Sequence, residues 1–160
     1  MRLMRSAIVL WAIGFGGVAA MAGDGPPVPD PADLMTLVHT TILAVADGNA
    51  NGDYAALHAM GTPAFQSKNP LTKLAAAFQA LRASRFDLSS IRGKFPPPPR
   101  SPTLDQNGRL RILGYYDLLA RQVVYDVLYD YDEPDARWRL AAISVTPRVL
   151  PPQPQLLQPE

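Results

Sequence analysis

The sequence predicts an α+β fold in which helices come first and an antiparallel sheet follows, on three observations. Apolar residues recur at steps of three and four over residues 31–81, as on the buried side of helices. Residues 103–112 carry a β-hairpin signal, and residues 122–131 alternate between apolar and polar side chains, as a strand with one buried face does. With 160 residues, 48% of them hydrophobic, we expect one domain with a real core.

The first 22 residues have the pattern of a secretory signal peptide. Arg2 and Arg5 precede an uncharged run over residues 7–22, and Ala20 and Ala22 form the A-x-A arrangement that signal peptidases cut. A retained membrane anchor is the alternative, but the run is shorter than the ~20 apolar residues that a spanning helix needs. We therefore expect cleavage after Ala22, a periplasmic or secreted mature protein, and no stable membrane anchor.

Cysteine is absent from the sequence, and the charges nearly cancel. The chain therefore has no disulfide, thiol nucleophile, cysteine metal site or lipid-modified cysteine. The 15 basic and 14 acidic residues give +1, and removal of Arg2 and Arg5 leaves 13 against 14, or −1. Because there is also no basic run, the sequence argues against nucleic acid and anionic membranes as partners. It favours a small molecule or a cell-envelope protein.

Residues 23–30 form a proline-rich lead that ends in a helix start. Asp30 is suited to cap the helix and Pro31 to occupy its first position. The predicted apolar stripe of this helix consists of Leu34, Leu37, Val38, Thr41, Ile42 and Val45. The helix is expected to end near residues 47–48, and Leu43, opposite the stripe, to be exposed or to contact a second subunit.

Further helical pieces are expected between residues 53 and 82. Asp53 is placed to cap a short helix that Gly61 stops, and Thr62 with its following proline opens another turn. Asn69 and Pro70 repeat the cap-and-proline device before a longer helix. On one side that helix carries Leu71, Leu74, Ala75, Phe78 and Leu81.

An extended connector, FPPPPRSP at residues 95–102, leads from the helices to the sheet. The hairpin that follows turns at Asn107-Gly108, which supplies the positive φ angles of a tight turn. In the strand at 122–131, the apolar face consists of Val123, Tyr125, Val127, Tyr129 and Tyr131. A last strand is expected at 137–145, followed by a disordered Pro/Gln-rich tail over 147–160.

This order of elements, with several short motifs, resembles the NTF2-like (SnoaL-like, cystatin-like) superfamily of exported bacterial proteins. The motifs are GDY at the second helix, L-x-x-x-F-x-x-L-R in the third, N-G-x-L-x-x-x-G-Y in the hairpin and W-R-L in the last strand. Their residues here are Gly52, Asp53, Tyr54, Leu74, Phe78, Leu81, Arg82, Asn107, Gly108, Leu110, Gly114, Tyr115, Trp138, Arg139 and Leu140. Over residues 31–146 the resemblance implies a cone of N-terminal helices packed on a curved antiparallel sheet, often dimeric. It selects no function, since the superfamily contains isomerases, dehydratases, cyclases and non-catalytic modules.

An enzyme in such a cone would need an acid or a base among buried apolar side chains, where burial shifts a carboxyl pKa toward neutrality. In the strand at 122–131, Asp126 and Asp130 fall on the face opposite the apolar one. The inward polar groups are therefore phenols, and the candidate pocket residues are Tyr125 and Tyr129, with Tyr131 on the same face. Tyrosine on a strand also has an ordinary explanation as packing.

The histidines give one further pocket candidate. His58 flanks the short second helix, where it could reach a pocket mouth, although a lone histidine there is ordinarily surface. His39 lies outside the apolar stripe and is expected in solvent. Their spacing fits no metal site, so the sequence predicts neither a metal nor a cofactor.

The stretch DGNANGDYAALH at residues 47–58 begins like a calcium loop. Asp47, Asn49 and Asn51 alternate before Gly52, but the twelfth position is His58, which lacks the two oxygens of the usual glutamate. A junction between two helices explains the same residues, and we prefer that interpretation.

Two functions stand as hypotheses. The first is an exported, non-catalytic NTF2-like module that binds a small apolar ligand or a cell-envelope protein. The alternative is a small isomerase, hydratase or dehydratase acting on an apolar carbonyl compound, with Tyr125 or Tyr129 as hydrogen-bond donor and His58 as proton acceptor. Val124 and Leu128, on the second face of the strand, also leave room for a homodimer.

Overall fold

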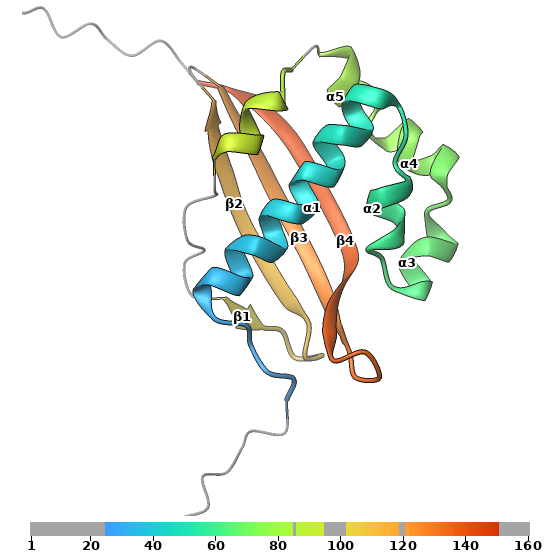
Figure 1. Cartoon of the computed structure of the whole chain (residues 1–160), viewed down its shortest axis with the longest axis vertical. Helices are drawn as coiled ribbons and strands as arrows, with labels where there is room; N and C mark the ends of the chain where they lie inside the picture. Colours follow the sequence, from blue (N-terminus) through green and yellow to red (C-terminus); the bar gives the residue numbers. More distant parts are fainter. Residues whose placement is uncertain (1–24, 85, 95–101, 119–120, 151–160) are drawn as a thin grey trace, which may run out of the picture.

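Figure 1 shows a computed structural model that describes residues 25–84, 86–94, 102–118 and 121–150. The predicted signal peptide, most of the proline connector and the tail beyond residue 150 lie outside the described residues. Helices precede an antiparallel sheet, so the predicted α+β class is confirmed. The elements are α1 (Pro31–Asn51), α2 (Ala55–Ala59), α3 (Pro63–Lys68), α4 (Leu71–Ala77), α5 (Gln79–Ala83), the 3-10 helix η1 (Ser89–Gly93), β1 (Thr103–Leu104), β2 (Leu110–Leu118), β3 (Arg121–Asp132) and β4 (Arg137–Val149).

Helix α1 lies diagonally across one face of the sheet (Figure 1). The Asp30 carboxylate accepts hydrogen bonds from the backbone N–H groups of Ala32 and Asp33, at 2.8 and 2.9 Å, and Pro31 follows it, as predicted. The predicted stripe is confirmed, because its buried members are Leu34, Val38, Thr41, Ile42 and Val45. Leu43, predicted to lie opposite the stripe, is half-buried against the core.

The predicted end of α1 at residues 47–48 is wrong, because the helix continues to Asn51. Gly52, with a φ of +75°, closes it in the left-handed conformation and donates its N–H to the Gly48 carbonyl at 2.8 Å. Gly48 lies inside the helix, and the ring of Tyr54 packs on it. A Cβ at Gly48 would come within 2.4 Å of Cδ1 of the tyrosine. This glycine therefore permits close packing and does not stop the helix.

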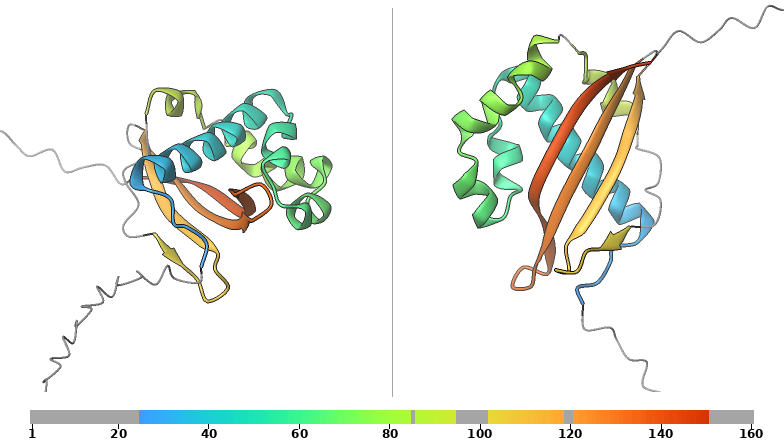
Figure 2. Two further views of the ribbon diagram at one scale, coloured as in Figure 1. Left: turned by 60° about the horizontal axis from the view of Figure 1, so that its bottom comes forward. Right: turned by 180° about the vertical axis from the view of Figure 1, so that it is seen from behind.

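Helices α2 to α5 form a group of short pieces near one end of α1, beside β4 (Figures 1 and 2). The Asp53 carboxylate accepts from the N–H of Ala55 at 2.8 Å, and the Thr62 hydroxyl accepts from the N–H of Phe65 at 3.0 Å. Thr62 is therefore the N-cap of α3, as predicted. Asp53 lies one residue before Tyr54, the N-cap of α2, and accepts from the first N–H of that helix.

The single longer helix predicted after Pro70 was wrong, because it breaks at Phe78 into α4 and α5. The Phe78 ring stacks on Tyr54, with centroids 5.2 Å apart, and the break accompanies this contact. Asn69 does not cap α4; its side-chain amide donates to the Phe65 carbonyl at 3.0 Å, at the end of α3. Leu71, predicted on the buried side, is 45% exposed.

The strands follow the order β1-β2-β3-β4, and each neighbouring pair is antiparallel. The side that faces α1, here called the inner face, carries the predicted apolar residues of β3. The opposite side, the outer face, carries Arg111, Leu113, Tyr115, Val124, Asp126, Leu128, Ala142, Ser144 and Thr146. No described helix crosses the outer face (Figure 2, right).

The hairpin turn and the end of β4 differ from the prediction. In the hairpin only Gly108 has a positive φ, +72°, because the Asp105 carboxylate accepts from the N–H groups of Asn107 and Arg109 and so holds a longer loop. Strand β4 runs through Pro147 to Val149, three residues into the predicted tail. A proline is tolerated there because β4 lies at the edge of the sheet.

The segment between α2 and α3 is tied to the free edge of β4. The Thr62 N–H donates to the Leu140 carbonyl at 2.8 Å, and the Leu140 N–H donates to the Met60 carbonyl at 3.0 Å. Gly61 lies between these two bonds, and a Cβ there would come within 2.3 Å of the Phe65 ring. This contact, here called the Gly61 bridge, joins the helical half of the chain to its last strand.

Candidate functional site

The predicted pocket residues Tyr125 and Tyr129 point from β3 into the layer between the sheet and α1. With Tyr116 of β2 they form a tyrosine cluster, in which each residue is 1% exposed. The rings of Tyr116 and Tyr125 lie 5.8 Å apart and are inclined by 55°. The structure therefore brings the two predicted tyrosines together, but within packed core.

The hydroxyl of Tyr129 is held by α1. It lies 2.8 Å from Oγ1 of Thr41, whose own proton is donated to the Leu37 carbonyl at 2.9 Å. Because that proton is already used, the phenol is the donor to Thr41. Burial raises the pKa of Tyr129, so the phenol stays protonated and acts as a link between β3 and α1.

Tyr125 packs over Gly114, its partner across the β2–β3 ladder. A Cβ at Gly114 would lie 2.2 Å from the phenol oxygen, so glycine is required for the ring to approach β2. Burial raises the pKa of Tyr125 to about 12. At neutral pH this phenol could donate a hydrogen bond but could not serve as a base.

His39, expected in solvent, is buried, and that prediction was wrong. The side chain is 9% exposed, and its Nδ1 lies 3.0 Å from the Tyr116 hydroxyl. Tyr116 of β2 contacts α1 outside the predicted stripe, and this contact explains the error. Burial lowers the pKa of His39, which favours the neutral imidazole.

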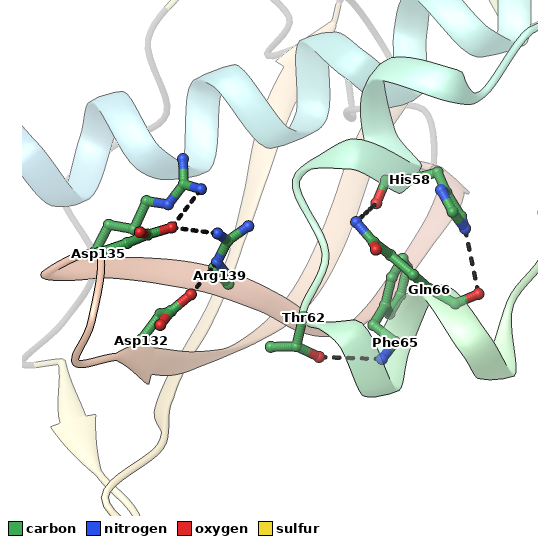
Figure 3. Close-up of polar contacts among 8 residues, drawn as sticks. His58, Thr62, Phe65, Gln66, Asp132, Asp135 and Arg139 are labelled. Atoms are coloured by element: carbon green, nitrogen blue, oxygen red, sulfur yellow. Dashed lines mark hydrogen bonds and ion pairs between the residues drawn. The ribbon is translucent and has the colours of Figure 1, made fainter.

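His58, the proposed proton acceptor, joins α2 to α3. Its Nε2 lies 3.2 Å from the Gln66 carbonyl, and the Gln66 amide donates to the His58 carbonyl at 3.1 Å (Figure 3). Within the described chain, no hydrogen bond joins His58 to Tyr125 or Tyr129. The three candidates therefore do not form one catalytic group.

A cleft of about 180 Å³ opens where α1, α2 and the start of β4 meet. Its lining consists of Leu37, Ala59, Met60, Tyr129, Arg137, Trp138, Arg139 and Leu140. Tyr129 reaches this cleft, whereas Tyr125 and His58 do not line it. The volume is below the ~300 Å³ at which ordinary small-molecule sites begin. Tyr131, the remaining inward tyrosine, packs edge-on against Trp138 with ring centroids 5.2 Å apart.

Aspartates of the β3–β4 turn neutralise the two arginines of the cleft. Arg139 forms ion pairs with Asp132 and Asp135 (Figure 3), and Arg137 donates to Asp135 at 2.8 Å. Arg139 and then Arg137 hold the pKa of Asp135 below its usual range. The cleft thus presents little unpaired charge. A sequence signal existed for part of this network, since Asp132 and Arg137 flank a four-residue turn and are cross-strand partners.

The outer face exposes apolar side chains. Leu113 is 59% and Tyr115 41% exposed, and Val124 and Leu128 are half-buried beside them; these four residues are called the outer patch. Asp126 also points to this face, as predicted, and accepts two hydrogen bonds from Arg111 at 2.9 and 2.6 Å. That pairing lowers the pKa of Asp126. The outer patch therefore lies around Asp126, whose charge is neutralised by Arg111.

The calcium-like stretch at residues 47–58 contains the end of α1, a short turn and the start of α2, so it is a junction between two helices, the preferred interpretation. Asp47, Asn49 and Asn51 all lie in α1, where residues two apart point to different sides. Asp47 forms an ion pair with Arg92 of η1. In the part of the chain that the structure describes, no three His, Asp or Glu side chains are grouped so as to hold a metal ion.

Comparison with protein-family models, with characterised proteins and with solved structures finds no match to this chain. Over the described residues, no helix has both the length and the apolar character needed to cross a membrane. Function is therefore inferred from the geometry of the inner and outer faces.

Proposed function

We propose that the chain is an exported, non-catalytic NTF2-like module that binds a cell-envelope protein through the outer face of its sheet. One contrast carries the proposal. Tyr125 and Tyr129 on the inner face are 1% exposed, whereas Leu113 and Tyr115 on the outer face are 59% and 41% exposed. Aromatic and aliphatic side chains gathered on an uncovered sheet are typical of protein interfaces.

Support for an NTF2-like arrangement comes from contacts between the motifs that suggested it. Tyr54 of the GDY motif stacks on Phe78 of the third-helix motif, and the Arg82 guanidinium lies over the Tyr54 ring at 5.6 Å. Gly114 of the hairpin motif receives the Tyr125 ring. These residues have structural roles, as expected of a shared fold and not of a shared reaction.

A protein is a better candidate partner than a small apolar ligand. The cleft that reaches Tyr129 holds about 180 Å³ and is bordered by paired arginines. An apolar ligand would gain little binding free energy there, because a cleft of this size can bury only a small part of its surface. A second copy of the chain is the rival occupant of the outer face, since Val124 and Leu128 belong to the outer patch.

The alternative function, an isomerase, hydratase or dehydratase of apolar carbonyl compounds, is supported by one observation: Tyr129 lines the cleft. It would require Tyr129 to exchange its bond with Thr41 for one with substrate, and a base other than His58. We therefore retain it as the second proposal.

Photo-crosslinking tests the main proposal. A photoreactive amino acid at position 115 should give a discrete adduct with another envelope protein in the exporting organism, and the additional change Leu113→Asp should abolish it. The matched control is position 71, where Leu71 is 45% exposed on α4 and should give no such adduct. Equal adducts from both positions, or none from position 115, would contradict the proposal; an adduct of twice the chain mass would identify a homodimer.

Native mass spectrometry of the gently purified protein separates the two functions. The expected spectrum shows a chain that begins at residue 23 and carries no organic ligand. A retained small molecule that is lost in Tyr129→Phe would instead favour the cleft and the enzyme.

A further inference from the structure

We propose that the end of the sheet at the β3–β4 turn holds a binding site for proline-rich segments, which the chain's own proline-rich lead occupies. The described part of the lead, residues 25–30, precedes α1 and passes beside β1, where a Cβ at Gly25 would lie 3.8 Å from the Leu104 side chain (Figure 1). A partner with a proline-rich segment would have to displace the lead. This inference goes beyond the proposed function and does not depend on the outer patch.

Proline determines the shape of the lead. Pro26, Pro27 and Pro29 each fix their own φ at about −65°, and each disfavours a helical conformation in the residue before it. Asp30, which precedes Pro31, has a φ of −66° and a ψ of 167°, close to the polyproline conformation. The lead is therefore an extended segment of the kind that polyproline-binding grooves recognise.

Trp138 of β4 contacts the lead through its indole. Its Nε1 donates to the Pro27 carbonyl at 3.3 Å, and its ring packs edge-on against Tyr131, its cross-strand partner. One residue earlier, Pro26 lies against Gly108 of the β1–β2 loop, where a Cβ would be 3.6 Å from the proline ring. Aromatic-lined grooves bind polyproline segments in this way, so the lead acts as an internal ligand of the Tyr131–Trp138 pair.

The lead is held loosely enough to be exchanged. Pro27 is exposed and Val28 is 45% exposed, so part of the lead faces solvent. Among the described residues, the indole of Trp138 is the one group of the sheet that donates a hydrogen bond to the lead. A segment of another protein could therefore replace the lead without breaking other hydrogen bonds of the sheet.

A hollow of about 410 Å³ beside the lead indicates what a better ligand would carry. Its lining includes Pro26 of the lead, Asp130, Glu133 and Arg109. Arg109 is shared between two carboxylates, because it lies 3.4 Å from Asp105 and 3.9 Å from Asp130. Within the described residues, Oδ1 of Asp130 is buried and accepts no hydrogen bond, and Glu133 takes no part in the ion pairs of the β3–β4 turn. The hollow is therefore suited to a cation.

The lead does not supply that cation, since residues 23–30, GDGPPVPD, contain no basic residue. A proline-rich segment with Arg or Lys at the place of Pro26 would reach the hollow while its next carbonyl accepts from Trp138. The cation would then pair with Asp130 and Glu133. We therefore expect the partner to be a protein with a proline-rich segment that contains a basic residue.

An NMR titration with synthetic peptides tests the site. The indole N–H of Trp138 is a direct probe, because the other tryptophan, Trp11, lies in the predicted signal peptide. The peptides GPPVPP, GRPVPP and GEPVPP differ only at the residue that takes the place of Pro26. GRPVPP should shift the indole signal and bind roughly fivefold more tightly than GEPVPP, with GPPVPP between them. No shift with any peptide, or equal binding of all three, would overturn the proposal.

Variants of the lead test whether it competes with the peptide. Pro26→Gly with Pro27→Gly should loosen the lead and lower the Kd of GRPVPP, because less of the site is then occupied from within. Val28→Ser, at an exposed position of the same segment, should leave this Kd unchanged. Weaker binding to the loosened chain would show that the lead supports the site and does not compete for it.

Variants of the sheet locate the two halves of the site. Trp138→Phe keeps an aromatic ring but lacks the N–H, and it should weaken the binding of all three peptides. Asp130→Asn with Glu133→Gln should remove the difference between GRPVPP and GEPVPP and leave the binding of GPPVPP unchanged. Circular dichroism should show the same cooperative thermal transition in each variant, which separates loss of the site from loss of the fold. A folded Trp138→Phe variant that binds as the unchanged protein does would contradict the proposed site.

Discussion

At the scale of residues, tyrosines decide how the core of this protein is built. Three phenols occupy the layer between α1 and the sheet, and each has a small or polar partner: Gly114 beneath Tyr125, Thr41 beside Tyr129 and His39 beside Tyr116. A buried phenol must satisfy its hydroxyl, so each tyrosine constrains its neighbours more than a phenylalanine would.

Gly114→Ala should destabilise the protein by about 1–3 kcal/mol, because the new methyl group overlaps the Tyr125 ring in a filled core. The cost should fall markedly in a Tyr125→Leu background, which removes the overlapping atoms. Gly93→Ala is the control, since no atom lies within 4 Å of a Cβ at that position. Urea unfolding of the four variants measures the coupling, and an additive double variant would contradict the proposed overlap.

His39 should make the protein less stable in mild acid. Its pKa is lowered by burial, so between the unfolded value of about 6.5 and the lower folded value the unfolded chain binds more protons. The free energy of unfolding should therefore decrease as the pH falls below about 6.5, with a slope no steeper than about 1.4 kcal/mol per pH unit. His39→Gln should remove this slope and His58→Gln should keep it; denaturant titrations from pH 7.5 to 5 would show the opposite pattern if His39 were not responsible.

At the scale of elements, the centres of helices and strands followed from the sequence better than their ends. The apolar stripe of α1 and the alternation of β3 were predicted correctly because each element is buried along one side, and burial along one side produces a periodic pattern in the sequence. Helix ends depend on distant contacts: Gly48 looked like a stop signal, but Tyr54 packs on it, and Phe78 interrupts a helix while stacking on Tyr54.

Ile42→Ala should cost about 2–5 kcal/mol, because Ile42 is fully buried where α1 crosses the sheet. Leu43→Ala, the neighbouring change, should cost clearly less, since Leu43 is only half-buried. Thermal and urea unfolding compare the two directly. Equal costs would mean that α1 presents a different side to the sheet.

At the scale of the whole molecule, the order of helices and sheet was predictable, but the site was only partly so. Strand alternation placed Tyr125, Tyr129 and Asp126 on the correct faces. It gave no information on whether the inner layer would contain an open pocket, because that depends on how α1 fits against the phenols. His39 was missed because its partner, Tyr116, lies on a distant strand. The paired arginines were missed although their partners, Asp132 and Asp135, lie in the same β3–β4 hairpin.

A chain that ends at residue 136, before β4, should not fold. It lacks Leu140, the half-buried apolar residues of β4 and the Gly61 bridge, so the helical group loses its contact with the sheet. Circular dichroism should show no cooperative thermal transition, whereas a chain that ends at Leu150 should retain one. A sharp transition in the shorter chain would show that β4 is dispensable.

The Gly61 bridge also has a consequence for the timing of folding. It joins residue 61 to residue 140, and the tyrosine contacts join α1 to residues 77 and 88 positions further along the chain. Contacts between such distant residues form late and slowly, because a long loop must close before any of them is gained. The first half of the chain can therefore leave the ribosome before a stable fold has formed. A chain that is still unfolded can pass through a protein-conducting channel.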